Sequence, residues 1–313
     1  MTALMVTKSG PRTTVQDLGR SGYQHQGLSP GGAADLRSFR WANHLLGNGT
    51  NAACLEITLG GFTATARQPL FLAITGADCQ GTVNGKPIPH WGVFFIEAGD
   101  ELELSTPSSG LLTYLAVVGG WQTRAFCGSR SCVSREGLTD LGVLAAETAL
   151  PAMETPADLD MDACLKREVP AQVRCELESN APLKLIPGPE YPTFSNLDRA
   201  RFLSACYTVG HQSDRMAYRL DGPALQSAGG IVSKGVTCGT VQVPGDGKPM
   251  VLLNDRQTIG GYPIIGTVAR LDCGRLAQKR PGEPVEFQWA DVADCQSERL
   301  LFEQQFNMTP WAS

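Results

Sequence analysis

The 313-residue sequence contains no long apolar run and no block of like charges. Its 31 acidic and 26 basic residues are scattered along the chain and leave a net charge of −5. Nucleic acid is therefore not an expected partner, because no cluster of basic residues is available to follow a phosphate backbone. The apolar window Leu111–Trp121 is too short to span a bilayer, and the first residues lack the apolar stretch of a signal peptide. We expect a cytoplasmic protein with no membrane association.

Paired cysteines and clustered histidines are also absent. Scattered cysteines in a chain of this size are typical of reduced thiols that pack as small apolar side chains. Zinc ligands usually come in close sequence pairs, so we expect neither a disulfide framework nor a zinc site. The cysteines are Cys54, Cys79, Cys127, Cys132, Cys164, Cys175, Cys206, Cys238, Cys273 and Cys295, and the histidines are His25, His44, His90 and His211.

Two motifs that carry cofactors are missing. Gly85-Lys86 and Gly247-Lys248 are each followed by proline, so neither is a Walker phosphate-binding loop. Any nucleotide must then bind with another geometry. The sequence also has no lysine flanked by methionines of the kind that carries biotin, so we expect no covalent biotin on this chain.

Glycine and proline, in contrast, are abundant, with 35 and 20 residues. This composition favours many short strands joined by tight turns. Apolar or alternating runs predict strands at Leu70–Thr75, Glu101–Leu104 and Leu111–Val118. One early helix is predicted, with Asp35 as its N-cap and Gly47 at its end. The predicted fold class is mainly β, as a β-rich α+β protein.

We divide the chain into four segments. Residues 1–150 are predicted to form an N-terminal β-rich domain that contains the early helix. Residues 151–180 are acidic, contain proline and show little periodicity, which indicates a connecting segment. Residues 181–290 form the predicted C-terminal β domain, and residues 291–313 a C-terminal helix and tail.

A short repeated pattern indicates two related halves. Asn84-Gly85-Lys86-Pro87 recurs as Asp246-Gly247-Lys248-Pro249. The second copy lies between strand patterns at Thr240–Val243 and Met250–Leu253, which predicts a hairpin there. A short helix is predicted after it, at Leu271–Gln278. Either the halves are related or common turn residues recur by chance.

The loop that follows Leu253 gathers varied polar chemistry. Its two adjacent glycines allow backbone N–H groups to approach an anion closely. Asp255 suits a base or a Mg²⁺ ligand, and Arg256 suits a phosphate. The alternative is an ordinary surface turn. The candidate residues of this loop are Asn254, Asp255, Arg256, Gln257, Thr258, Gly260, Gly261 and Tyr262.

A second candidate group lies near the N-terminus and comprises Gln16, Asp17 and Arg20. Asp17 and Arg20 either help to bind an anion or only form a weak surface pair with each other. The segment Ser29–Asp35 leads into the predicted helix. It either binds an anion at the helix N-terminus or only turns the chain and caps the helix.

Arg215 and Glu56 are two further charged residues for which the sequence makes a prediction. Arg215 is either a clamp for a carboxylate or phosphate, or one half of a buried structural ion pair. Glu56 lies in an apolar strand pattern, and by alternation we expect it to face solvent.

Nine motifs, in order along nearly the whole chain, are similar to those of one family. They are Thr13-Thr14-Val15-Gln16-Asp17-Leu18-Gly19-Arg20, Leu55-Glu56-Ile57-Thr58-Leu59-Gly60-Gly61, Thr75-Gly76-Ala77-Asp78, Tyr114-Leu115-Ala116-Val117-Val118-Gly119-Gly120, Gly128-Ser129-Arg130-Ser131, Pro187-Gly188-Pro189-Glu190, Ser213-Asp214-Arg215-Met216, Val241-Gln242-Val243-Pro244, and Asn254-Asp255-Arg256-Gln257-Thr258 with Gly260-Gly261-Tyr262-Pro263. The chain resembles the allophanate hydrolase subunit 2 family, also called the biotin-dependent carboxyltransferase-like family, which includes the C-type subunits of 5-oxoprolinase.

This resemblance implies a cyclophilin-like β-barrel architecture and two partner subunits of 5-oxoprolinase: a related smaller one, of the B type, and a third, of the A type. It also implies one of three functions. The first is ATP-dependent opening of 5-oxo-L-proline to L-glutamate, and the second is a biotin-dependent carboxyltransferase component. The third is a non-catalytic regulatory module that antagonises a kinase inhibitor. The length of the chain, without a fused biotin carboxylase or carrier segment, favours the hydrolase.

As part of a hydrolase, the chain is expected to use ATP, with Mg²⁺, and to be active only with its partners. Under that reading Asp255 serves in metal binding or proton transfer, Arg215 neutralises anionic charge and Tyr262 orients the substrate. Gln16 and Asp17 are expected to form the opposite wall of the site. The substrate- or anion-binding candidates are Gln16, Asp17, Arg20, Asn254, Arg256, Gln257, Thr258, Gly260 and Gly261.

Overall fold

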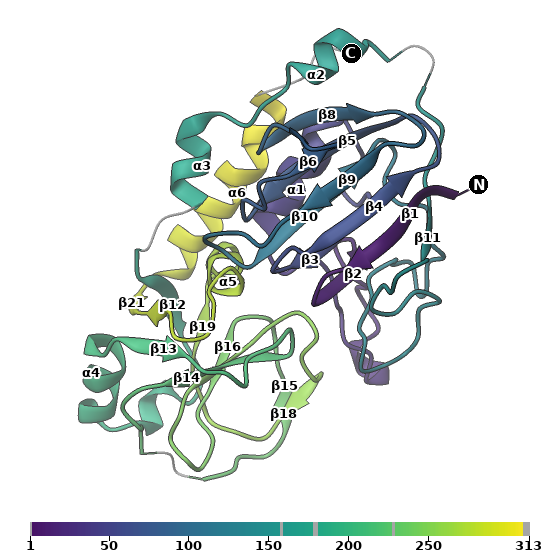
Figure 1. Ribbon diagram of the computed structural model, residues 1–313. Helices are drawn as coiled ribbons and strands as arrows, with labels where there is room; N and C mark the ends of the chain where they lie inside the picture. The colour runs from purple at the N-terminus through teal and green to yellow at the C-terminus, as the bar shows by residue number, and fades with distance from the viewer. Residues whose placement is uncertain (1, 157–158, 178–180, 227–228, 309–313) are drawn as a thin grey trace. The chain divides into compact units, whose positions relative to one another are not determined.

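The computed structural model describes residues 2–156, 159–177, 181–226 and 229–308, and it is mainly β (Figure 1). These residues fall into two compact units. The first contains Met1–Arg20 and Gly31–Leu177, and the second contains Ser21–Pro30 and Glu178–Thr309. A ten-residue stretch near the N-terminus thus belongs to the second unit, although sequence analysis assigned it to the N-terminal domain.

The first unit consists of two antiparallel sheets. Its core contains apolar residues of both, among them Leu4, Phe62, Leu72 and Leu115, so the sheets face each other across that core. One sheet has the order β11-β1-β4-β9-β6-β7, and the other has the order β2-β3-β10-β5-β8. The strands are β1 (Thr2–Ser9), β2 (Arg12–Gln16), β3 (Cys54–Thr58), β4 (Phe62–Ala66), β5 (Leu70–Gly76), β6 (Thr82–Val83), β7 (Lys86–Pro87), β8 (Gly92–Ile96), β9 (Glu101–Leu104), β10 (Leu112–Val117) and β11 (Ala149–Pro151).

A sharp corner carries the chain from one sheet to the other between β3 and β4. Leu59, Gly60 and Gly61 all have left-handed backbone angles, with φ of 58°, 61° and 65°. A Cβ atom at Gly60 would lie 1.9 Å from the carbonyl oxygen of Ser105, which is a forbidden approach. Glycine is therefore required at this corner.

The predicted early helix is confirmed as α1 (Leu36–Leu45). The Asp35 side chain accepts hydrogen bonds from the backbone N–H groups of Arg37 and Ser38, as an N-cap does. One face of the helix packs on the five-stranded sheet, where the ring of Phe39 meets that of Tyr114 with centroids 6.4 Å apart. Figure 1 shows the helix behind β10.

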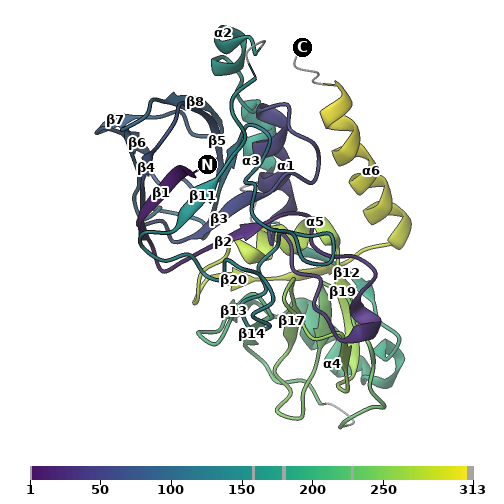
Figure 2. The same cartoon turned by 90° about the vertical axis from the view of Figure 1, so that its right-hand side faces the viewer.

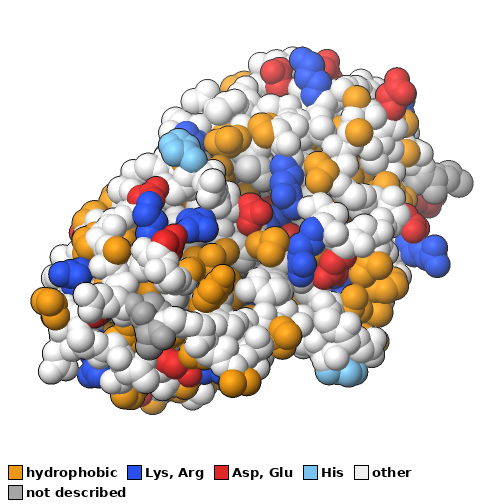
Figure 3. Space-filling model, turned by 90° about the horizontal axis from the view of Figure 1, so that it is seen from below, with side chains coloured by type: hydrophobic (Ala, Val, Ile, Leu, Met, Phe, Trp, Pro, Cys, Tyr) orange, Lys and Arg blue, Asp and Glu red, His pale blue; other side chains and the backbone are white. Residues whose placement is uncertain are grey.

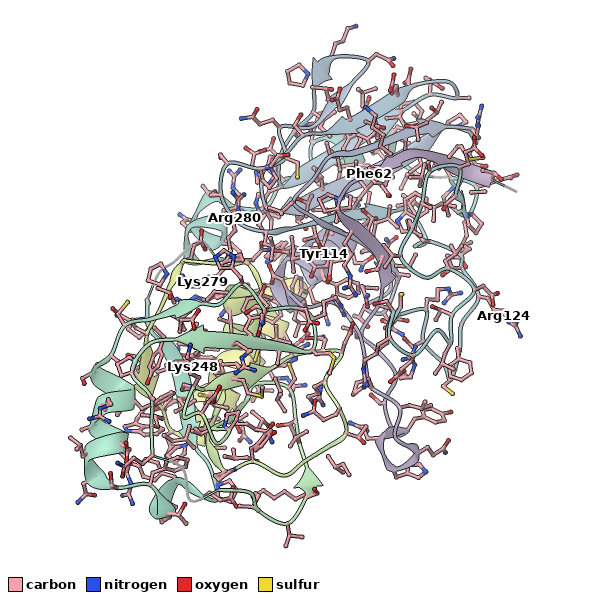
Figure 4. All side chains as sticks on the ribbon, turned by 60° about the horizontal axis from the view of Figure 1, so that its bottom comes forward. Phe62, Tyr114, Arg124, Lys248, Lys279 and Arg280 are labelled. Carbon is pink, nitrogen blue, oxygen red and sulfur yellow. The ribbon has the colours of Figure 1, made fainter. Side chains whose placement is uncertain are left out.

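Because α1 covers this sheet, the expectation that Glu56 faces solvent is wrong. Glu56 is only 2% exposed. Its Oε2 accepts hydrogen bonds from the backbone N–H of Ala34 and from the Tyr114 hydroxyl, at 2.9 and 2.7 Å. Tyr114, labelled in Figure 4, has its pKa raised by burial and by the nearby Glu56 charge. Glu56 therefore fixes the start of α1 from inside the unit.

The remaining part of the first unit contains two short helices, α2 (Met161–Leu165) and α3 (Ala171–Leu177). The side chain of Asp160 caps α2 by accepting from the backbone N–H of Ala163. The strands predicted at Leu70–Thr75, Glu101–Leu104 and Leu111–Val118 are confirmed as β5, β9 and β10.

The second unit is built on one eight-stranded sheet with the order β20-β13-β14-β17-β16-β19-β12-β21. Its two edge strands, β20 (Pro284–Val285) and β21 (Phe287–Trp289), are separated by one residue of the chain. The edges must therefore lie close together, and the sheet curls into a nearly closed barrel (Figures 1 and 2). The other strands are β12 (Leu183–Pro187), β13 (Tyr207–Val209), β14 (Ala217–Asp221), β16 (Thr240–Gln242), β17 (Met250–Leu252) and β19 (Ile264–Val268).

The predicted hairpin in this unit is confirmed, since β16 and β17 are antiparallel neighbours joined by the turn that contains Lys248 (Figure 4). Lys248 Nζ donates to Asp221 Oδ1 at 2.8 Å, so the ammonium group is paired with a carboxylate of the same unit. A separate two-stranded ribbon pairs β15 (Lys234–Gly235) with β18 (Ile259–Gly260). The helices are α4 (Asn196–Ser204), α5 (Arg270–Ala277) and α6 (Val292–Met308), with 3₁₀ turns at Gln24–Gln26 and Tyr191–Thr193, and α5 confirms the helix predicted after the hairpin.

On the face shown in Figure 3, lysine and arginine side chains are interspersed with aspartate and glutamate. Among the described residues, no helix is both long and apolar enough to cross a membrane. The nine cysteines whose side chains are described are all thiols.

Candidate functional site

The loop that follows β17 is buried at its start, and this overturns the surface-turn alternative for its first three residues. Asn254, Asp255 and Arg256 are 3%, 3% and 6% exposed. The backbone N–H of Asp255 donates to the carbonyl of Arg215 at 2.9 Å, which extends the β14–β17 pairing into the loop. Further along, Tyr262 is 44% exposed, so the loop rises from the interior to the surface.

Asp255 and Arg215 form a buried two-pronged ion pair. Arg215 Nε donates to Asp255 Oδ2 at 3.0 Å, and Arg215 Nη2 donates to Asp255 Oδ1 at 2.9 Å. Two parallel hydrogen bonds hold the guanidinium and the carboxylate in one relative orientation. They are also stronger than a single hydrogen bond between the same two groups. Arg215 is therefore in the ion-pair arrangement that sequence analysis left as an alternative to a clamp. The carboxylate of Asp255 is held in one orientation.

Arg256 folds back onto the backbone beneath the loop. Its Nε donates to the carbonyl of Val236, and its Nη1 donates to that of Leu253, both at 3.3 Å. Burial lowers the pKa of this guanidinium. The carbonyl of Arg256 accepts from the hydroxyl of buried Ser29 at 2.7 Å. Ser29 therefore ties the segment Ser21–Pro30 to this loop.

Cys238 is a member of this cluster that sequence analysis missed. Its Sγ lies 3.7 Å from Asn254 Oδ1 and 3.9 Å from Arg270 Nη1. A hydrogen bond from the buried Cys273 thiol, together with the charges of Arg270 and Arg256, lowers the pKa of Cys238 to about 6 against the opposing effect of burial. No local sequence signal marks it, because Arg270 and Cys273 come from α5.

Cys238 is expected to be alkylated by iodoacetamide at a rate that rises through about pH 6 and levels off above it, since the thiolate is the nucleophile. Mass spectrometry of the intact fold over a pH series measures this. Arg270→Gln removes one favourable charge and is expected to move the midpoint upward, with Cys238→Ser as the control that identifies the modified peptide. A midpoint near the ordinary value of 9.0 would contradict the prediction.

Gly260 and Gly261 lie where little space is available. A Cβ atom at Gly260 would sit 2.3 Å from Nε2 of Gln242, and one at Gly261 would sit 3.2 Å from Oγ of Ser233. Gly260 also pairs with Lys234 in the β15–β18 ribbon. The absence of a side chain at Gly260 thus lets the ribbon cover the buried amide of Gln242.

The N-terminal candidates lie in the first unit and organise the loop Gly128–Cys132. Asp17 is 1% exposed and accepts four hydrogen bonds. Their donors are the backbone N–H groups of Gly19 and Arg130 at 2.8 and 2.6 Å and the hydroxyls of Ser129 and Ser131 at 2.6 and 2.5 Å.

Gln16 and Arg20 hold the same loop. Gln16 Nε2 donates to the carbonyl of Cys132 at 2.9 Å, and Arg20 Nη2 donates to that of Ser131 at 2.7 Å. Arg20 also pairs with Glu136 at 3.6 Å. Arg20 is 2% exposed, so the alternative of a surface pair between Asp17 and Arg20 is wrong. That these residues line a wall opposite Asp255 stays a prediction.

The described residues contain no group of three or more histidine, cysteine, aspartate or glutamate side chains that could hold a metal ion. Asp255, the residue expected to bind Mg²⁺, instead has both oxygens on Arg215. The described side chains of this chain do not fit a Mg²⁺ site by themselves.

The chain thus combines a unit of two facing β-sheets with a unit built on a nearly closed β-barrel that carries a buried polar loop. Residues 26–289 match the family described as carboxyltransferase domain, subdomain A and B. The chain belongs to this family, which confirms the resemblance found in its motifs.

Three known proteins are similar to this chain. The C-type subunit of the 5-oxoprolinase of Escherichia coli K12 is 34% identical over 312 residues, which cover 98% of both chains. The urea amidolyase of Saccharomyces cerevisiae is 26% identical over 306 residues, covering 91% of this chain but 16% of that protein. The crystal structure of the Kluyveromyces lactis urea amidolyase matches 97% of this chain and 20% of its own with a TM-score of 0.86 and 23% identity, which shows a shared fold.

Proposed function

We propose that this chain is one component of an ATP-dependent 5-oxoprolinase, which opens the lactam of 5-oxo-L-proline to give L-glutamate. The observation that carries the proposal is the 34% identity to the C-type component of a 5-oxoprolinase over 98% of both chains. The match in length means that the whole chain, rather than one domain of a larger enzyme, corresponds to that component.

The reaction must overcome a resonance-stabilised amide. In the proposed sequence, the γ-phosphoryl group of ATP passes to the lactam oxygen and ADP leaves. Water then adds to the activated carbon, and the ring C–N bond breaks with a proton delivered to nitrogen, which leaves an acyl phosphate. A second water attacks this acyl phosphate and releases phosphate and the γ-carboxylate of glutamate. Such a site needs donors aimed at developing oxyanion charge and a group that moves a proton.

In this proposal Asp255 moves the proton, and Arg215 holds its carboxylate in the required orientation through two hydrogen bonds of 3.0 and 2.9 Å. Arg256 and the backbone at Gly260-Gly261 supply positive charge and donors, and exposed Tyr262 orients the substrate. The chain lacks a Walker loop, and its described residues lack a Mg²⁺ site. We therefore propose that the partner subunits, of the A and B types, supply or share the ATP site.

The experiment is reconstitution. The chain is mixed with its partner subunits, and ATP hydrolysis and glutamate formation are measured with and without 5-oxo-L-proline, and again with this chain omitted. Glutamate is expected from the complete set alone. No glutamate from the complete set would refute the proposal.

A second candidate is a component of a biotin-dependent carboxyltransferase. It is favoured by the family match and by the similarity to urea amidolyase. Transfer of a carboxyl group from a carboxybiotin carrier to urea, measured with the same preparation, distinguishes it from the hydrolase.

A further inference from the structure

Gln242, at the end of β16, carries a fully buried amide. The residue is 0% exposed. Neither Oε1 nor Nε2 has a hydrogen-bond partner among the described residues. Burying an unpaired amide costs free energy, and native proteins rarely leave both groups of one side chain in this state. Such a group therefore points to something that it binds.

The surroundings of the amide are apolar. In the sheet register, Gln242 stands opposite Ile264 on β19 and Met250 on β17. Ile264 belongs to a small apolar cluster with Val236 and Leu252, against which Met250 packs. An amide in such surroundings is desolvated, so it discriminates strongly between molecules that can and cannot complete its hydrogen bonds.

The cover over Gln242 is the β15–β18 ribbon (Lys234–Gly235 with Ile259–Gly260). The ribbon has two paired residues on each strand, and Ile259 within it is 59% exposed. Lys234 ties the ribbon down through an ion pair with Glu190, whose other carboxylate oxygen accepts from the backbone N–H of Ile264 at 3.2 Å. So short a ribbon has little stability of its own, and a partly exposed ion pair adds little.

We propose that Gln242 is a substrate-binding residue that pairs with the amide edge of a cyclic amide when the ribbon lifts. This inference rests on the proposed function. In a five-membered lactam the N–H and C=O groups lie on the same side of the ring. A carboxamide presents one donor and one acceptor at matching spacing, so two parallel hydrogen bonds form. An amine ring such as that of proline has no carbonyl beside the ring nitrogen and leaves the Nε2 donor unpaired.

Gln242→Met tests this proposal, because methionine has a similar length and no polar group at its end. In the assembled complex, kcat/KM for 5-oxo-L-proline is expected to fall by at least about 100-fold. The melting temperature of the isolated variant chain is expected to equal or exceed that of the wild type, because the unpaired amide is gone. Gln172→Met, at an exposed position on α3, is the matched control and is expected to change neither quantity.

A second measurement uses the same variant: Gln242→Met is expected to lose binding of the lactam probe 2-pyrrolidinone to the complex, because the donor and the acceptor at the end of the side chain are both gone. Undiminished kcat/KM in Gln242→Met would overturn the inference. So would a lower melting temperature, which would show that the amide serves the fold through a buried water. Glutamate formation by the wild-type complex tests the proposed function separately: if it is absent, both proposals fail, and if it is present, the variants decide on Gln242 alone.

Discussion

Replacing Asp255 with alanine is expected to abolish glutamate formation by the complex and to lower the free energy of unfolding of the chain by about 3–5 kcal/mol. The cause is the Arg215 guanidinium, which is 8% exposed and would lose both oxygens of its two-pronged partner. Urea denaturation of the isolated chain measures the stability, and the reconstituted assay measures activity. An exposed pair serves as the control: Asp246→Ala, which removes the partner of Arg219 at 2.8 Å, is expected to cost less than about 1 kcal/mol.

The double variant Arg215→Met with Asp255→Leu separates stability from chemistry. It removes both charges and replaces them with apolar side chains, so it is expected to regain most of the lost stability. Glutamate formation is expected to stay absent, because the proton-transfer group is still missing. Recovery of activity in the double variant would show that the ion pair only supports the fold, and a cost below about 1 kcal/mol for Asp255→Ala would contradict the stability prediction.

Local patterns predicted the elements of the fold well. The N-cap Asp35, the turn between β16 and β17 and the alternation in β9 each depend on neighbours along the chain. Closure of the barrel was not visible in this way, because it depends on β20 and β21 pairing with opposite ends of one sheet. The resemblance supplied that architecture instead.

Glu56 shows why alternation alone misled. An antiparallel strand in a sheet with one solvated face alternates between buried and exposed residues. Here α1 covers the second face, and the carboxylate satisfies the backbone N–H of Ala34 and the hydroxyl of Tyr114. Whether a helix will cover a sheet face is a tertiary property, and the residues next to Glu56 in the sequence do not indicate it.

Only part of the candidate site was predicted, for a similar reason. The loop from Asn254 was recognised because its polar residues are contiguous. Cys238 and Gln242 were missed because their significance depends on partners that arrive from elsewhere: Arg270 from α5 for the thiol, and Gly260 for the amide. Gln242 lay within a motif of the family resemblance, which was the one signal available for it.

Replacing Asp17 with alanine is expected to lower the free energy of unfolding by about 3–5 kcal/mol, because four donors converge on this buried carboxylate. Asp17→Asn is expected to cost less. Its oxygen can keep the position of Oδ1 and the three donors there, while its NH₂ group meets the N–H of Arg130 in place of Oδ2. The loss in free energy of unfolding is therefore expected to increase with the number of hydrogen bonds lost, from Asp17→Asn to Asp17→Ala.

Hydrogen exchange locates the effect of these two substitutions. Loss of Asp17 is expected to speed exchange at the backbone amide of Arg130, which donates to Oδ2, more than at strands of the opposite sheet such as β4. Asp140→Ala is the matched control, because Asp140 is 59% exposed and lies 3.6 Å from Arg124, also an exposed residue. It is expected to change the unfolding free energy by less than about 1 kcal/mol. Equal costs for Asp17→Asn and Asp17→Ala would show that the negative charge, rather than the count of hydrogen bonds, holds the Gly128–Cys132 loop in place.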